Sequence, residues 1–471
     1  MKTKVILSIS ILIPFTMLFL YVWTTATDLI IRDDMYLIKG GFIESYLKGT
    51  LTFADLWRPT NCMRILGGAL IYIADVKWFS MNLKMITLLN PFLILASALL
   101  IYREYRKSLI QKFSPEFIAA SYFMITLIIF HIIQWEALIN SGSIAFQYPM
   151  PFIVASFISL ELFLLKGKLK YLPAALILPS LAVLVFGGRL VFVFAPTLGI
   201  IFLCYLITRR FHLAKDFWHR ALMIVIFLSI IGFLYIYRID YNDYVQSPQY
   251  LESEIFEVFV RPVDALKFIL ASFGASIIGI DAFFACNYIS FNIMVAIGFI
   301  TVTFYAVALI LFFTSHMYER TFLPLFLIIQ TFLYLGFMTI GRFGIQSTGL
   351  DFGMASRYTC VSLYGVASIV WIFIFIFAQH QPASILTKGT IIAGFSMIFA
   401  GLLLTSIAVW NNQPRQKVFF EQLRDIALRL DTATPDELAN FAERPDMVRG
   451  SLLLLREHKL NVYRNVPAGR K

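Results

Sequence analysis

Long apolar runs separated by short polar segments dominate the chain, and this pattern predicts an all-α protein that crosses a membrane many times. The first run, Val5–Trp23, follows two lysines and lacks the small-residue cleavage site of a signal peptide, so we interpret it as an uncleaved span. Further runs of spanning length bring the expected total to about eleven. They lie near Phe79–Tyr102, Phe117–Trp135, Pro149–Leu165, Leu172–Phe186, Leu190–Ile207, Ala221–Tyr237, Phe291–Phe313, Phe322–Ile340, Thr359–Phe377 and Ile391–Trp410.

The segment that follows the last run, residues 411–471, has a different pattern. Gln416–Leu430 carries apolar residues at helical spacing. Thr434 is a suitable helix N-cap, with Pro435 after it and Glu437 in the capping-box position. We expect a small helical tail that packs on the membrane domain of residues 1–410, since about 60 residues bury little core alone.

Composition strengthens the membrane interpretation. Of the 471 residues, 59% are apolar and only 14% are charged, whereas soluble domains carry about 25% charged residues. So few charges cannot cover soluble domains of this total length, which excludes a soluble enzyme, a disordered chain and a nucleic-acid-binding domain. A transmembrane β-barrel is disfavoured because its strands alternate apolar and polar residues.

The net charge of +11 indicates orientation, because cytoplasmic loops of membrane proteins carry an excess of lysine and arginine. Short basic loops follow the second, fourth and sixth expected spans. The long opposite loop, residues 25–78, is balanced in charge and contains amphipathic stretches that fit juxtamembrane helices on the extracytoplasmic side. The basic loops contain Arg103, Arg106, Lys107 and Lys112, then Lys166, Lys168 and Lys170, then Arg209, Arg210, Lys215 and Arg220.

Two adjacent carboxylates, Asp33 and Asp34, stand near the start of this first outer loop. Adjacent acids at a membrane surface repel each other, so they persist most readily where a metal ion, a cationic partner or a substrate compensates them. The alternative is a solvated pair that caps the following helix. In the same loop Arg58 and Arg64 are candidates for substrate binding, with contact to lipid headgroups as the alternative.

A second polar cluster brackets the loop between two late spans. Arg342 and Arg357 flank a glycine-containing stretch, and Tyr358 follows directly. Arginine presents a planar, permanently charged fork that suits phosphate, and a lipid phosphate lies at the depth of a span end. Anchoring at the membrane interface is the alternative. Glu136 and Arg189 are lesser candidates for substrate binding, with structural roles as their alternative.

This arrangement resembles the GT-C glycosyltransferase superfamily, and within it bacterial polytopic transferases. The resemblance rests on the acidic pair just after the first span, on the membrane-lying helices expected in the first outer loop, and on the late segment Ala355–Thr359 preceded by Gly341-Arg342. The segment from Trp57 to Arg64 stands where the family has an aromatic-to-His-Arg segment, but Cys62-Met63 occupies the place of the histidine.

The resemblance implies a transferase of the bacterial inner membrane that moves a sugar from a polyprenyl-phosphate donor, such as undecaprenyl phosphate, to a glycan or lipid-linked acceptor of the cell envelope. Lipopolysaccharide or another polysaccharide is an example, and inversion at the anomeric carbon is expected. Asp33 or Asp34 is then the base that activates the acceptor hydroxyl, and Arg342, Arg357 and Tyr358 bind the donor phosphate. The superfamily includes members with and without a metal ion, so Mg²⁺ or Mn²⁺ on the two aspartates stays open.

One apolar stretch, Val263–Ile280, permits two topologies. It contains Asp264 and Lys267, and it either spans the membrane or lies on the outer surface as an amphipathic helix. The resemblance requires Arg342 and Arg357 on the same side as Asp33. We therefore expect a surface helix, about eleven spans, an extracytoplasmic active site and an extracytoplasmic tail.

Other functions fit the same residues. A transporter or flippase for lipid-linked glycans would hold phosphate with the arginines and use the acids as coupling groups, although the related halves of many transporters are not visible in this sequence. A polymerase or ligase of the O-antigen type also joins lipid-linked sugars, but it takes an oligosaccharide donor.

Overall fold

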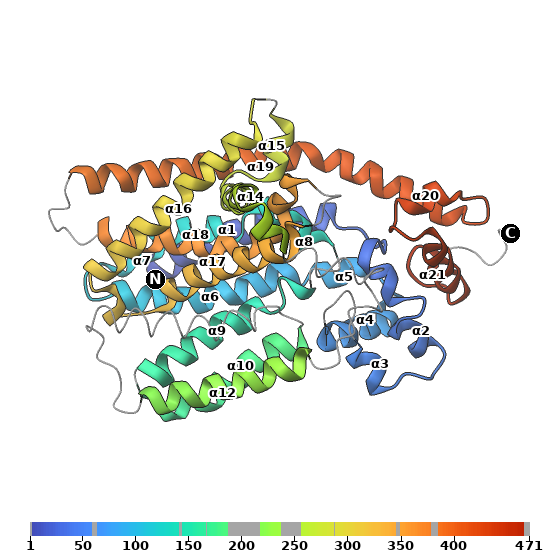
Figure 1. Ribbon diagram of the computed structural model, residues 1–471, viewed down its shortest axis with the longest axis horizontal. Helices are drawn as coiled ribbons and strands as arrows, with labels where there is room; N and C mark the ends of the chain where they lie inside the picture. The colour runs from blue at the N-terminus through green and yellow to red at the C-terminus, as the bar shows by residue number, and fades with distance from the viewer. Residues whose placement is uncertain are drawn as a thin grey trace.

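The computed structural model of the protein describes residues 2–58, 64–140, 144–165, 167–186, 217–236, 256–286, 288–344, 349–377 and 385–465. All regular elements in these ranges are helices. Figure 1 shows long helices that run roughly side by side, with short helices and the C-terminal tail gathered beyond one end of the bundle. The predicted all-α fold class is confirmed for the described residues.

Seven helical segments are long and apolar enough to cross a membrane, and three shorter apolar helices accompany them. The shorter helices stand where three of the expected spans were, and the expected span Leu190–Ile207 lies outside the described residues. The seven segments are α1 (Lys2–Thr25), α5 with α6 (Leu83–Thr87 and Asn90–Leu109), α7 with α8 (Pro115–Ile129 and Trp135–Ile139), α16 (Phe291–Thr314), α17 (Leu323–Arg342), α18 (Ser356–Phe377) and α19 (Ile385–Leu428). The three shorter apolar segments are Met150–Phe163, Leu169–Val185 and His219–Leu234. They include α9 (Met150–Leu160), α10 (Leu172–Ser180) and most of α12 (Phe217–Ile236), respectively.

Helix α18 is the most enclosed of the spans. Nearly every side chain from Tyr358 to Phe375 is buried, as expected for a helix that is apolar all round. It packs against α7, α16 and α17, and its Trp371 donates a hydrogen bond to Ser108 of α6 at 3.1 Å. Helix α18 is therefore enclosed by the bundle along most of its length.

The two ends of the bundle carry different side chains. At one end, beside the N-terminus, Thr3 donates to Glu116, Lys107 pairs with Glu161, and Arg320 donates to Gln111, 2.7 Å away. The first contact joins α1 to α7, and the other two involve residues in or beside the loops in which the sequence concentrates lysine and arginine. The first loop, the C-terminal end of α17 and the first turn of α18 lie at the opposite end.

The first loop folds into a 3₁₀-helix and three short helices before α5, namely η1 (Arg32–Leu37), α2 (Phe42–Leu47), α3 (Phe53–Trp57) and α4 (Leu66–Phe79). A capping box between Thr52 and Asp55 starts α3. Phe53 and Trp78 are largely exposed, which fits helices that meet lipid at the membrane interface.

The ambiguous stretch forms α14 (Pro262–Ala275), which is shorter than the roughly 20 residues of a typical span. Figure 1 shows α14 end-on, whereas the long helices run across the view, so α14 crosses the bundle. Gly298 of α16 lets the two helices approach closely, because a Cβ there would lie 1.7 Å from the carbonyl oxygen of Leu270.

The last span and the start of the tail form one continuous helix, α19, rather than the two helices expected. Its 44 residues include Pro414, which cannot donate to the preceding turn. Neighbouring side chains support the helix at this point, since Gln413 donates to Thr24 and Thr25 of α1. The helix therefore continues through the polar segment that the sequence suggested as a boundary.

The rest of the tail contains α20 (Pro435–Ala439), α21 (Pro445–Glu457) and η10 (Asn461–Tyr463). The predicted capping box of α20 is confirmed, since Thr434 and Glu437 exchange side-chain to backbone hydrogen bonds. Asn461 donates from its backbone to the carbonyl of Ser80 at 2.8 Å and from its side chain to that of Met81 at 2.9 Å. The tail is thus packed against the first loop (Figure 1).

Candidate functional site

An ion-pair network joins three segments that are far apart in sequence. Arg32, at the start of η1, donates from Nη1 to Oε1 of Glu136 at 2.5 Å. Arg357, in the first turn of α18, donates from Nη1 to the same oxygen. The backbone N–H of Glu136 donates to Oγ of Ser356 at 3.0 Å. The first loop, α8 and the late Ser-Arg-Tyr segment therefore meet at one carboxylate.

Local structure explains how Glu136 reaches this position. Helix α7 ends at Ile129, and Nδ1 of His131 accepts the N–H of Ile133 to cap the short turn η2 (Ile132–Gln134). The chain then starts α8 at Trp135 in a new direction. Glu136 lies in the first turn of α8, where the helix dipole favours a negative charge.

The acidic pair predicted from the sequence lies within η1, next to this network. Asp34 is buried, and its Oδ1 accepts a hydrogen bond from the hydroxyl of Tyr72 in α4 at 2.7 Å. Asp33 lies in the same 3₁₀-helix, and its side chain is outside the described part of the chain. One carboxylate of the pair therefore has a fixed orientation supplied by the first loop.

Aromatic rings surround the guanidinium of Arg357. Its central carbon lies 5.0 Å from the ring centres of both Phe352 and Tyr358. The ring of Tyr358 also packs edge-on against Phe146 at 6.5 Å. Stacked aromatic faces stabilise a cation and fix the plane of its fork. Tyr358 therefore helps to orient Arg357.

The other predicted arginines have different surroundings. Arg342 ends α17 at the same end of the bundle as Arg357, is half-buried, and has no ion pair among the residues that the structure describes. Arg64 is buried, donates to the carbonyl of Trp57 and lies 5.0 Å from that ring centre. Arg58 is exposed, and Arg189 lies outside the described residues.

A second polar contact involves Trp135, the residue before Glu136, and no sequence feature indicated it. Asp281 of α15 (Ile280–Ala285) accepts a hydrogen bond from the indole of Trp135 at 2.5 Å and another from Asn412 of α19 at 3.1 Å. Burial raises the pKa of Asp281, and these two hydrogen bonds oppose the rise. Helix α19 is thereby linked to the residue that precedes Glu136.

No group of three or more His, Cys, Asp or Glu side chains that could hold a metal ion occurs among the described residues. The acidic residues of the site are Asp33, Asp34 and Glu136. The carboxylate of Glu136 already pairs with Arg32 and Arg357. With the side chain of Asp33 outside the described part of the chain, we derive no step through a metal ion.

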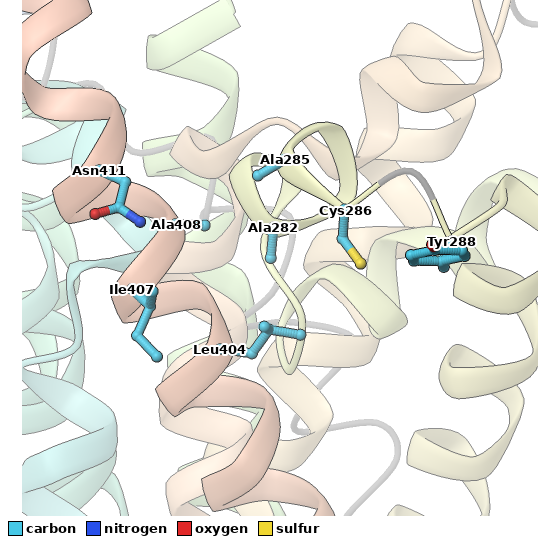
Figure 2. Close-up of a pocket in the computed structure, with 8 residues that line it drawn as sticks. All are labelled: Ala282, Ala285, Cys286, Tyr288, Leu404, Ile407, Ala408 and Asn411. Carbon is cyan, nitrogen blue, oxygen red and sulfur yellow. The ribbon is translucent and has the colours of Figure 1, made fainter.

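An open groove lies between α15 and α19 (Figure 2). Its volume is about 410 Å³. Its lining is mostly apolar and includes Leu404, Ile407 and Cys286, with Asn411 at one side. None of the residues predicted as site residues lines this groove. The polar network, rather than the groove, is the candidate site.

Sequence reasoning identified the segments of the site but not all of its members. Arg32 was not predicted as a site residue, although its position directly before the acidic pair could have indicated it. Ser356 stood within the late segment that carries the resemblance, but its contact with Glu136, 220 positions away, was not predictable. Tyr72 carried no signal, because its partner Asp34 lies 38 positions away. Compared with protein-family models, curated proteins and solved structures, this chain matches none of them.

Proposed function

We propose that this protein is a GT-C-type glycosyltransferase that moves a sugar from a polyprenyl-phosphate donor to a hydroxyl of a cell-envelope glycan or lipid-linked acceptor. One observation carries the proposal: Arg32 and Arg357 share the carboxylate of Glu136, so the segment with Asp33 and Asp34 adjoins the late Ser-Arg-Tyr segment. A transferase of this kind needs a base and a phosphate-binding cation in one place.

The chemistry follows from these groups. Asp34, or Asp33 beside it, removes the proton of the acceptor hydroxyl as its oxygen bonds to the anomeric carbon. The bond between that carbon and the phosphate oxygen breaks, and its electron pair leaves with the polyprenyl phosphate. Arg342 and Arg357 stabilise the charge that grows on the phosphate. Direct displacement inverts the anomeric configuration.

Glu136 has a supporting role in this mechanism. It engages one nitrogen of Arg357, and a guanidinium has five N–H donors, so other donors remain for a phosphate. The pairing fixes the fork before the donor binds, which lowers the ordering cost of binding. Arg342, without an ion pair among the described residues, supplies a further positive charge at the same end of the bundle.

We propose that this end of the bundle faces the extracytoplasmic side of a bacterial inner membrane. The opposite end holds basic residues in short loops, and such loops stay in the cytoplasm. The crossing orientation of α14 supports its assignment as a surface helix, and packing of the tail on the first loop supports an extracytoplasmic tail.

The proposal is tested with purified protein in liposomes that contain undecaprenyl-phosphate sugars and envelope glycolipid acceptors, with release of undecaprenyl phosphate as the readout. Asp33→Asn and Asp34→Asn should each fold, and at least one should abolish transfer. Asp446→Asn, an exposed substitution in the tail, is the matched control and should retain full transfer. Wild-type transfer by both site variants would contradict the catalytic assignment.

A further inference from the structure

The C-terminal tail contacts the acidic segment on both of its flanks. Before the segment, Asp28 pairs with Arg424 of α19 and with Arg464 after η10, the latter at 3.0 Å. After the segment, the backbone N–H of Lys39 donates to Oγ of Ser451 in α21 at 3.3 Å. The tail therefore contacts the chain on both sides of residues 32–37.

The tail also bonds the segment itself. The N–H of Arg32 donates to the carbonyl of Phe441 at 2.6 Å, and Oγ of Ser451 donates to the carbonyl of Met35 at 3.2 Å. Phe441, Ser451 and Met35 are fully buried. The buried hydroxyl of Ser451 donates to Met35 and accepts from Lys39, so it fixes the distance between these two backbone groups.

The backbone of Arg32 needs this support. Its φ of 55° lies in the left-handed region, which costs a residue other than glycine about 1 kcal/mol or more. Such a conformation persists only where the surroundings impose it. Arg32 bonds the tail with its backbone and Glu136 with its side chain, so it connects the tail to the arginine network.

We infer that the C-terminal tail positions the acidic segment for the reaction, with Ser451 as a positioning residue. This inference rests on the proposed function for the identity of the reaction. Ser451 holds Met35 and Lys39 and thereby sets the path of η1. The carboxylates of η1 are aligned with the acceptor hydroxyl only while that path is kept.

The test compares Ser451→Ala with Thr432→Ala in the full-length protein. Thr432 is an exposed tail residue whose hydroxyl donates to Arg429 at 3.1 Å, so its substitution removes a hydroxyl without touching η1. In Ser451→Ala, hydrogen exchange of amides 35–41 should be several-fold faster, because the N–H of Lys39 loses its acceptor. Turnover should fall about tenfold with an unchanged KM for the donor. Thr432→Ala should match the wild type in all three measurements.

Two results overturn the inference. Unchanged exchange of amides 35–41 in Ser451→Ala would show that the hydroxyl does not hold the segment. Faster exchange with unchanged turnover would show that the contact is structural only. Sugar transfer by the wild type is measured before the variants are compared. Its absence would contradict the proposed function and is distinct from both results above. A thermal unfolding midpoint close to that of the wild type confirms that Ser451→Ala is folded.

Discussion

Arg357 donates a hydrogen bond to the carboxylate of Glu136, although 221 positions separate these residues in the chain. The pair fixes the first turn of α18 against α8, and Arg32 joins it from the first loop. This contact brings the permanently charged fork of Arg357 next to the segment that carries two aspartates.

Glu136→Gln should lower the stability of the protein and slow sugar transfer. The amide cannot balance two arginines, and loss of one partner in a partly buried pair costs about 1–3 kcal/mol. We expect a lower free energy of unfolding, measured by denaturant titration, and at least tenfold slower transfer. Glu116→Gln is the matched control, because Glu116 is exposed at the opposite end. Equal effects of the two substitutions would contradict the role of Glu136.

Tyr72→Phe should slow turnover without weakening donor binding. The substitution removes only the hydroxyl that donates to Asp34, and a carboxylate without this bond samples more orientations. We expect a decrease of about tenfold in kcat with an unchanged KM for the donor. Tyr288→Phe, at a side chain that is 90% exposed, controls for the loss of a hydroxyl. Wild-type turnover in Tyr72→Phe would indicate that Asp34 does not act as the base.

Arg357→Ala should impair use of the donor more than use of the acceptor, since the proposed ligand of Arg357 is the lipid phosphate. Steady-state kinetics with each substrate varied in turn measures both effects. We expect the KM for the donor to rise at least tenfold. Arg320→Ala, at the opposite end, should leave both constants unchanged. Equal changes for donor and acceptor in Arg357→Ala would contradict a phosphate role.

A buried acid in α4 should make stability depend on pH. Burial raises the pKa of Asp75 to about 7, against the opposing effects of the Asn82 amide and of Arg464. In the unfolded chain the pKa of an aspartate is about 4. The higher pKa of Asp75 in the folded protein therefore stabilises the fold fully below that pH, and this contribution is lost as the pH rises through 7. Asp75→Asn should therefore unfold near the wild-type temperature at pH 5 and a few degrees higher at pH 8.

Asp446→Asn is the control for this pH dependence. The backbone N–H of Met447 lowers the pKa of Asp446, so that carboxylate stays charged between pH 5 and 8. Its substitution should change the unfolding temperature equally at both values. The Asp75 prediction is wrong if Asp75→Asn also shows the same difference from the wild type at pH 5 and pH 8.

Topology can be tested with a single cysteine. In a variant whose native cysteines are replaced, Thr348→Cys should react with a membrane-impermeant maleimide from outside, because the C-terminal end of α17 and the first turn of α18 lie on the side of the first loop. Lys168→Cys, in a basic loop, should react only after the membrane is opened. The reverse pattern would overturn the orientation.

The sequence predicted the fold well where the signal is local. Apolar runs identify α1, α16 and α18 because a span must be apolar along its whole length. The capping box at Thr434 was also visible, since all its partners lie within four residues. The continuity of α19 was not visible, because the side chains that support it at Pro414 come from α1 and from Gln413.

The site was predictable only in parts. Asp34 and Arg357 stood out because charge is scarce outside the basic loops. Glu136 was a lesser candidate, yet it joins the other segments, and its two arginine partners lie 104 and 221 positions away. Spacing along a chain gives no information about contacts over such separations. The contribution of the tail was hidden for the same reason.

We propose that a lipid phosphate binds between Arg357 and the acidic segment. A cryo-electron microscopy structure of the protein in nanodiscs with undecaprenyl phosphate tests it most directly. We predict density for the phosphate within hydrogen-bonding distance of Arg357 or Arg342, on the side of Asp34. Phosphate density only at the basic loops of the opposite end, or none at saturating lipid, would contradict phosphate binding by these arginines.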